Sequence, residues 1–564
     1  MVKNDPALQA FLLPLRIEID RLYRLSYRLS LTYRELAAGS ADQFFPTAIT
    51  SLPTGHEKGR YLAVYLGLNY LRIAFIELLG EEQVGKRSHV RRTLEKAWPI
   101  ENRLRQDQAD SLFAWIGDCI AEVIHDDLAN SKGDAPEEVT MAISFCFPTK
   151  QTLVNEAILM PTGKGFMIKT SLNLHQSLLD GYERHKTRHD SDLDETSAKR
   201  QKRYRLPKLR ITVMTNDSIS TLASLAYSIR ALPNTRVVMG LIVGAGCNAA
   251  VPMKLADLQE LKTRHIREQE PEAEKTIVST EWTLRGASGP LQELGILTKW
   301  DSEVDAHSSR PGFQPLECMV GGRFIGELVR TICFDWFHGS LLVPRSSLPT
   351  KLVERYSLTT DFLSLVVASS HSDEQLAQEL SQKLPAPHSS EWKWTPEYAV
   401  HMRCIAAAVQ DRSAALVAAA TVGLLACTGE IRLRNTESEE GITTNDSNNA
   451  ENSLNQEHRL VFGGSSATGW QNGPEELVVA VSGGVMQHYP YYKETIQRYI
   501  DRLIINSGPQ SEGKSIFLRE ASDGGIIGVG VLAGTVAGEI KDIVGTTMDE
   551  GHKLETNPTN TTDS

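Results

Sequence analysis

The residues of this 564-residue chain that could do chemistry stand where apolar strands give way to polar turns. The strand expected at 209–215 leads into the turn TNDSIST, which places Asn216 beside Asp217. A carboxylate is one of the groups that can serve as a general base. The same turn is also a good start for a helix, in which Asp217 would act only as a capping residue.

Further candidates follow the same logic, and each has a plainer structural alternative. The turn Gly244–Gly246 follows a strand expected at 237–243. Glycine turns let backbone N–H groups approach phosphates, although small residues there also serve strand–helix packing. Glu281 and Glu317 each stand beside apolar residues and could be buried structural acids. Lys164, in the sequence GKGF, could be a solvated loop lysine.

The elements that must position these residues alternate between strands and helices, which is typical of the α/β class. Two neighbouring strands are expected within 61–75, joined by a tight turn at Gly67. Because such a turn joins antiparallel strands, we expect a sheet of mixed strand directions. The remaining predicted elements are strands at 139–147, 209–215 and 237–243, and helices at 6–36, 106–125, 222–229, 321–337 and 399–427.

Composition limits the function classes. Charged residues make up 23% and hydrophobic residues 41%, which is ordinary for a soluble globular chain. The formal net charge of −11 argues against bulk binding of nucleic acid or anionic membranes. No stretch reaches the roughly 18 uninterrupted apolar residues of a membrane span, and the N-terminus lacks a signal-peptide pattern. Seven cysteines without a CxxC pair disfavour a disulfide framework and a zinc site, so we expect an intracellular protein without a metal centre.

Two segments depart from globular composition. Residues 183–205 are almost entirely charged and change from acidic (DSDLDET) to basic (KRQKRYR), and residues 435–458 are nearly devoid of apolar side chains. Both compositions predict surface insertions without a core of their own. The basic cluster in the first segment is either a solvated loop or a signal for an acidic import receptor; it comprises Lys199, Arg200, Lys202, Arg203 and Arg205.

Several separated segments, in one order along the chain, resemble the hexokinase family. They include SFCFPTKQTLVNEAILMPTGKGF, TNDSIST, GLIVGAGCNAA, STEW, the stretch from WDSEVDAHSSRPGFQ to GELVR, and LVVAVSGGV. Any one motif is weak, but the likeness extends from about residue 45 to residue 539. It implies a two-lobed α/β fold of the actin-like, ribonuclease H-related type, with a central cleft.

On the sugar side, the resemblance implies a largely retained site. Asp217 falls where the family has its general base, and the positions that contact the sugar fall on Lys164, Asn216, Asn248, Glu281, Gln314 and Glu317. Three departures weaken this pocket. Cys146 replaces a serine, Gly163 replaces a threonine, and Arg310 replaces an asparagine.

On the phosphate side, the resemblance is degraded. Tyr65 replaces the aspartate that helps to order Mg²⁺, and Leu68 replaces a glycine whose freedom at positive φ is wanted. Ala245 replaces a residue with a hydroxyl group, Ser482 replaces an acidic residue, and Ile527 replaces a basic residue. Mg·ATP is the family's cofactor, and its remaining candidate contacts are Gly67, Asn69, Arg72, Gly244, Gly246, Gly483, Gly524 and Gly525.

The resemblance also implies a domain organisation. We expect an N-terminal helix at 1–44, a small lobe at 45–208 that carries the charged insertion, and a large lobe at 209–525 that carries the polar insertion. A helix at 526–546 is expected to return to the small lobe, followed by a disordered tail at 547–564.

Three hypotheses about function remain. The favoured one is a hexose-binding, sugar-linked regulator with impaired catalysis, which acts through protein partners in the cytoplasm and in a nuclear pool. The second is an active ATP-dependent hexose 6-kinase with Asp217 as its base. The third is a scaffold that has lost both ligands.

Overall fold

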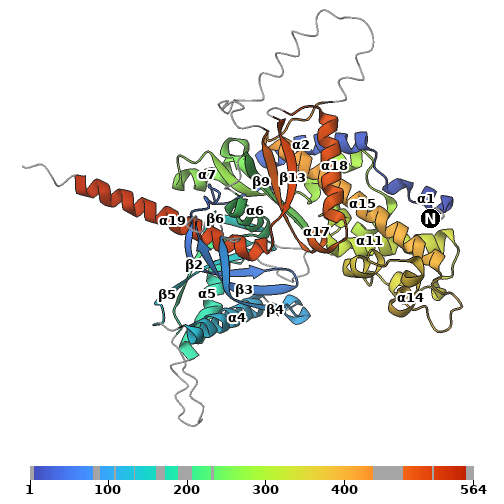
Figure 1. Ribbon diagram of the computed structural model, residues 1–564, viewed down its shortest axis with the longest axis horizontal. Helices are drawn as coiled ribbons and strands as arrows, with labels where there is room; N and C mark the ends of the chain where they lie inside the picture. Colours follow the sequence, from blue (N-terminus) through green and yellow to red (C-terminus); the bar gives the residue numbers. More distant parts are fainter. Residues whose placement is uncertain are drawn as a thin grey trace, which may run out of the picture.

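The computed structural model describes residues 5–80, 89–106, 109–131, 134–160, 172–188, 206–229, 234–435, 474–510 and 513–553. Two mixed sheets form its frame (Figure 1). Five strands in each sheet follow the same pattern: three successive strands pair antiparallel, a fourth pairs in parallel with the first, and a fifth pairs in parallel with the fourth. This confirms the predicted α/β class with mixed strand directions.

The larger sheet has six strands, and its edge strand comes from the N-terminal part of the chain. Their order is β1 (Phe45–Pro46), β11 (Lys275–Ser279), β10 (Cys247–Lys254), β9 (Thr235–Val243), β12 (Glu476–Ser482) and β13 (Ser515–Glu520). Strand β1 pairs antiparallel with β11, opposite Val278 and Ser279.

The smaller sheet has five strands, and the predicted turn at Gly67 joins two of them. Their order is β4 (Val90–Pro99), β3 (Tyr70–Leu79), β2 (Lys58–Leu66), β5 (Glu138–Phe145) and β8 (Lys208–Asn216). A separate hairpin follows β5, formed by β6 (Thr149–Leu153) and β7 (Glu156–Leu159). All of strand β8 belongs to the smaller sheet, although the predicted boundary between the lobes falls at its first residue, Lys208. The division into lobes at 208 stays a prediction.

Two helices, α6 (Asp217–Ile229) and α19 (Gly524–Lys553), lie between the sheets (Figure 1). Helix α6 packs on β9 and β10 of the larger sheet, and α19 packs on β2, β5 and β8 of the smaller one. The two helices cross closely because Gly528 has no side chain: a Cβ there would lie 1.7 Å from the Ser220 carbonyl oxygen. This crossing sets the position of Asp217, the first residue of α6.

The outer faces of both sheets are covered by further helices. Helices α4 (Ala109–Asn130) and α5 (Leu174–Arg188) cover the smaller sheet. The core beside the larger sheet is built by α2 (Ile19–Gly39), α11 (Gly322–Phe334), α15 (Pro396–Cys427) and α18 (Tyr492–Ser507). The shorter helices are α1 (Pro6–Phe11), α3 (Asn102–Gln106), α7 (Glu260–Gln269), α8 (Ser288–Glu293), α9 (Lys299–Ala306), α10 (Pro315–Val320), α12 (Thr350–Val353), α13 (Thr360–Phe362), α14 (Asp373–Lys383) and α17 (Gly484–His488).

Several predicted boundaries differ from those of the structure. The helix expected at 6–36 is broken around Pro14, which lacks the N–H that a continuous helix needs. Helix α6 begins at Asp217 rather than at 222. Helix α5 extends to Arg188, so the first residues of the predicted insertion 183–205 are helical. Helix α19 extends to Lys553, into the expected disordered tail. Residues 189–205, 436–458 and 554–564 lie outside the described residues.

Helix α15 has the length and apolar composition of a helix that could cross a membrane. However, 78% of its most apolar window is buried inside the protein. Its partners α2, α11 and α18 surround it, as expected for the central helix of a globular core.

Candidate functional site

The junction between β8 and α6 presents the pair Asn216 and Asp217. The Asn216 Oδ1 atom accepts hydrogen bonds from the Ser218 backbone N–H (2.9 Å) and from the Ser218 hydroxyl (2.6 Å), and its amide donates to the Phe147 carbonyl (3.4 Å). Asn216 is therefore the residue that caps α6. Asp217, 7% exposed, is the first helical residue, where the helix dipole stabilises a carboxylate. Asp217 thus lies at the helix start, and its role as a base stays a prediction.

Glu281 is held in a buried network on the edge of the larger sheet. Its Oε1 atom accepts hydrogen bonds from the Asn248 amide (2.8 Å) and the Ser279 hydroxyl (3.2 Å). The Asn248 Oδ1 atom in turn accepts from the Glu281 backbone N–H at 3.0 Å. Glu281 has a φ of 47°, unusual for a residue with a side chain. Side chain and backbone are thus both fixed, and such strain is typical of functional sites.

Glu317 lies in α10 and contacts the turn Gly244–Gly246, the second glycine turn. Its Oε2 atom accepts hydrogen bonds from the Cys247 backbone N–H (3.1 Å) and the Thr283 hydroxyl (3.4 Å). A Cβ at Gly246 would lie 2.9 Å from the same oxygen, so the absence of a side chain there permits the approach. Gln314, 4% exposed, lies at the N-terminal end of α10. The larger sheet therefore brings Asn248, Glu281, Gln314 and Glu317 to one region.

The structure describes two of the three residues that differ from the family's pattern on the sugar side. Cys146 is buried just after β5, and its N–H bonds to the Leu66 carbonyl at 3.0 Å. Arg310 is exposed and places its guanidinium 3.6 Å from the centre of the Phe313 ring. Lys164 and Gly163 lie outside the described residues, so their assignment stays a prediction.

The candidate site draws on residues from the smaller and the larger sheet. Burial lowers the pKa of Arg105, which lies in helix α3. Cys146 follows strand β5 of the smaller sheet, whereas the Arg323 backbone N–H bonds to Ala245 in the glycine turn of the larger sheet. The candidate residues thus come from both sheets: Asn216 ends β8 of the smaller sheet, and Asn248 lies in β10 of the larger one. The cleft between them stays a prediction.

The ring of Tyr65 packs against two of the glycines predicted for the phosphate side. A Cβ at Gly525 would lie 2.8 Å from two Tyr65 ring atoms, and one at Gly67 would lie 3.2 Å from a third. Burial, and then the Asp217 carboxylate, raise the pKa of Tyr65 well above its ordinary value. The side chain is therefore neutral at physiological pH. A neutral ring packed between two glycines does not fit a Mg²⁺ ion, which prefers oxygen ligands in octahedral geometry.

The second glycine turn is used for packing. The Gly244 N–H bonds to the Gly246 carbonyl at 2.9 Å, and the Gly244 carbonyl accepts from the Gly322 N–H at 2.8 Å. Gly483 has a φ of 109°, and a Cβ there would lie 2.5 Å from the Val243 carbonyl oxygen. Gly524 packs in the same way on Thr221 of α6. These contacts fit the strand–helix packing alternative.

Two further candidate nucleotide contacts are engaged within the protein. Arg72 forms ion pairs with Glu95 and, at 2.6 Å, with Asp523, while Arg92 pairs with Asp523 at 2.7 Å. Although burial alone would raise the pKa of the Asp523 carboxyl, its arginine partners lower it overall. The Asn69 Oδ1 atom accepts a hydrogen bond from Arg105 at 3.0 Å. Arg72 thus ties the smaller sheet to the start of α19.

Three polar residues of the site were missed at the level of sequence. Ser279 and Thr283 donate to the carboxylates of Glu281 and Glu317. Their hydroxyls flank Glu281 in the stretch STEWT, which was a readable signal. Gln43 donates to the Glu281 carbonyl oxygen at 2.9 Å. It lies 238 residues from Glu281 in sequence, and no local pattern indicated it.

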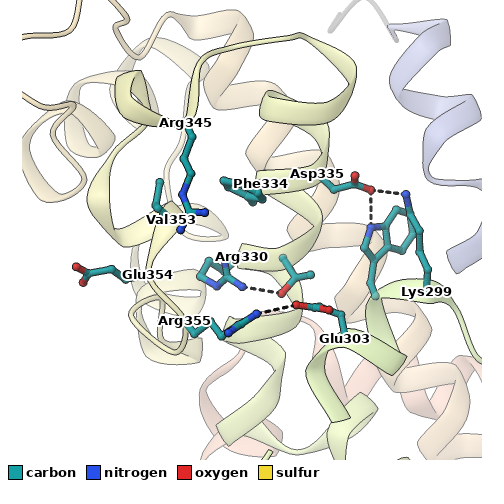
Figure 2. A pocket seen from close by; sticks show the side chains of 11 residues that line it. Lys299, Glu303, Arg330, Phe334, Asp335, Arg345, Val353, Glu354 and Arg355 are labelled. Carbon is teal, nitrogen blue, oxygen red and sulfur yellow. Dashed lines mark hydrogen bonds and ion pairs between the residues drawn. The ribbon is translucent and has the colours of Figure 1, made fainter. Parts of the chain in front are cut away.

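A separate cavity of about 780 Å³ lies among α9, α11 and α12, and contains none of the predicted site residues. Most of its charged groups are paired, as with Lys299 and Asp335 at 2.6 Å and Arg355 and Glu303 at 3.1 Å. Figure 2 shows the Arg345 guanidinium pointing between Phe334 and Val353. Throughout the described ranges, no group of three or more His, Cys, Asp or Glu residues is placed to hold a metal ion.

Comparisons with known proteins agree with this architecture. Two sequence models of the hexokinase family match residues 7–227 and 238–535, and the chain belongs to this family. It is 26% identical over 326 residues to the human (Homo sapiens) hexokinase HKDC1, covering 58% of this chain but only 31% of that protein. It is 24% identical over 497 residues to a chloroplastic hexokinase-2 of Nicotiana tabacum, covering 88% of this chain and 82% of that one.

The solved structures confirm the fold. A hexokinase from Schistosoma mansoni, complexed with glucose, superposes with a TM-score of 0.68 at 21% identity, covering 94% of this chain and 98% of that one. A second hexokinase structure gives a TM-score of 0.61 at 20% identity. The predicted two-lobed, actin-like hexokinase fold is therefore confirmed. The chain spans about a third of the length of the curated relative HKDC1 from human.

Proposed function

We propose that this protein binds glucose between its two sheets and acts as a sugar-linked regulator with little or no phosphotransfer activity. The observation that carries the proposal is the contrast between the two halves of the site. Asn248 is hydrogen-bonded to Glu281, and Glu317 accepts from the neighbouring Cys247 N–H, whereas Tyr65 fills the space beside Gly525. Hexokinase relatives support a hexose as the ligand, and the Schistosoma mansoni structure holds glucose.

The hydrogen-bonding chemistry of the site suits a polyhydroxylated ligand. Carboxylates accept hydrogen bonds from sugar hydroxyls, and amides both donate and accept. A site of this kind discriminates strongly, because a ligand without the matching hydroxyl leaves buried polar groups unpaired at about 1–3 kcal/mol each. Asp217, at the start of α6, would hold a further hydroxyl.

A second candidate function is ATP-dependent phosphorylation of the hexose, the chemistry of the family. It is favoured by the placement of Asp217, which as a buried carboxylate at a helix start could take the proton of a sugar hydroxyl. Tyr65 disfavours it, since the ring stands where metal and phosphate would be handled. No step through Mg·ATP follows from the residues present.

Binding of glucose is expected to raise the thermal unfolding midpoint. A ligand at 100 times its dissociation constant adds about 2.7 kcal/mol to the free energy of unfolding. Thermal unfolding measured in rising D-glucose, with L-glucose as the control, tests this expectation. An unchanged midpoint in millimolar D-glucose would instead favour a scaffold without a sugar ligand.

We also propose that protein partners read the charged segment 183–205, and that a nuclear pool exists beside the cytoplasmic one. The support is its basic cluster Lys199, Arg200, Lys202 and Arg203, in a chain whose net charge is −11. Clustered basic residues of this kind are recognised by acidic import receptors. Replacing these four residues by alanine in a fluorescent fusion is expected to deplete the nuclear signal. If the wild-type fusion and the alanine variant have the same distribution, the cluster is a solvated loop and not an import signal.

A further inference from the structure

The backbone around Glu281 is held from outside the sheet by Gln43. The Gln43 amide donates to the Glu281 carbonyl at 2.9 Å, and its Oε1 atom accepts the Gly286 N–H at 3.0 Å. Gln43 is 3% exposed, so these bonds do not compete with bulk water. One side chain thus spans both ends of the turn that follows β11.

Gln43 is itself fixed by Lys262 from helix α7. The Lys262 Nζ atom donates to the carbonyls of Gln43 (2.6 Å) and Phe44 (3.2 Å). Phe44 has a φ of 55°, and its N–H bonds to the Thr280 carbonyl at 3.0 Å. Two residues with positive φ, Phe44 and Glu281, therefore lie just before β1 and just after β11, and the hydrogen bonds of Gln43 and Phe44 connect these two segments.

The surroundings of Lys262 favour its neutral form. Burial, and then repulsion from Lys150, lower the pKa of Lys262 to about 8, while Asp42 opposes the shift. The Nζ atoms of Lys150 and Lys262 lie 5.7 Å and 5.4 Å from the centre of the same Phe45 ring. Asp42 is itself near Arg285, at 3.8 Å.

We propose that Gln43 and Lys262 are positioning residues that hold Glu281 in hexose-binding geometry and make the hexose affinity fall in alkaline solution. The inference rests on the proposed function, because Glu281 is taken to contact the sugar. Charged donors form hydrogen bonds about twice as strong as neutral ones. Loss of the Lys262 proton therefore loosens the Gln43 and Phe44 carbonyls, and with them the turn at Glu281.

Protein stability is expected to change in the opposite direction. The pKa of Lys262 lies below that of an unfolded lysine, about 10.4. Between about pH 8 and pH 10.4 the unfolded chain binds the proton more strongly, so the contribution of this lysine to stability rises with pH. A fall in hexose affinity over that range is thus not a sign of unfolding.

Calorimetric titration of the full chain with glucose at pH 7 and pH 9 tests the inference. We expect wild-type affinity to fall several-fold at pH 9, and Lys262→Arg, which stays charged, to remove this dependence. Gln43→Met keeps the side-chain volume but removes both hydrogen bonds, and it should weaken glucose binding at least fivefold at pH 7. Gln292→Ala, an exposed glutamine on nearby α8, is the matched control.

A second readout needs no sugar. Amide hydrogen exchange at Gly286, measured at pH 7, should accelerate in Gln43→Met but not in Gln292→Ala. The inference is overturned if Gln43→Met binds glucose like the wild type, or if Lys262→Arg keeps the pH dependence. If the wild-type protein does not bind glucose, the proposed function and this inference both fail. If the wild type binds glucose but the variants do not differ from it as stated, only this inference fails.

Discussion

Phosphorylation of glucose by this protein is expected to be at least about 10³-fold slower than by an ordinary kinase of its class. Phosphoryl transfer depends on positioning and electrostatics, and loss of one such contact costs about 10²–10³ in rate. By the resemblance to the family, Tyr65 stands where a carboxylate is expected, Leu68 where a glycine is expected and Ile527 where a basic residue is expected. The Tyr65 ring also packs directly on Gly525, so the change is one of space as well as of charge.

A coupled assay for sugar phosphate, with saturating glucose and Mg·ATP, measures this rate. The double variant Tyr65→Asp with Leu68→Gly restores a carboxylate and a small residue, and it is expected to gain activity over the parent protein. Tyr65→Phe is the matched control, because it keeps the ring and adds no carboxylate. A wild-type turnover of about 1–100 s⁻¹, the usual range for kinases, would contradict this prediction.

Loss of either buried carboxylate is expected to abolish glucose binding. Glu281 and Asp217 are 4% and 7% exposed, and hydrogen bonds to charged groups contribute about 1.5–3 kcal/mol each. Glu281→Ala also leaves the Asn248 amide and the Ser279 hydroxyl without their acceptor. We therefore expect Asp217→Ala and Glu281→Ala each to reduce affinity by 100-fold or more, on the order of two such hydrogen bonds.

The matched control is Glu303→Ala, which removes a surface carboxylate paired with Arg355 in the separate cavity. It is expected to bind glucose like the parent protein, as measured by titration calorimetry. Unfolding curves of all three variants separate loss of the site from loss of the fold. Parental affinity in both Asp217→Ala and Glu281→Ala would mean that the pocket lies elsewhere.

Local patterns were enough to predict the parts of the fold that local physics determines. The alternating strands around Gly67 form the antiparallel pair β2 and β3, and the apolar run before TNDSIST forms β8. The start of α6 was misplaced because small polar residues after Asp217 are ambiguous in sequence. Asn216, rather than Asp217, satisfies the helix N-terminus, a choice that depends on backbone geometry.

The contacts that reach across the chain could not be predicted in this way. Arg72 pairs with Asp523, 451 residues later, and Gln43 bonds to Glu281, 238 residues later. The sequence indicated that Tyr65 lacks the chemistry of a carboxylate. That its ring fills the space beside Gly525 follows only from the fold, which brings α19 onto β2.

The central claim is that the sugar half of the site works while the phosphate half does not. Titration calorimetry of the purified protein with glucose, with and without Mg·ATP, tests it most directly. The account predicts that glucose binds at one site per chain and that Mg·ATP does not change its affinity. It also predicts that the calorimeter cell contains no sugar phosphate after the titration. Absence of glucose binding, or binding of Mg·ATP with rapid formation of sugar phosphate, would contradict it.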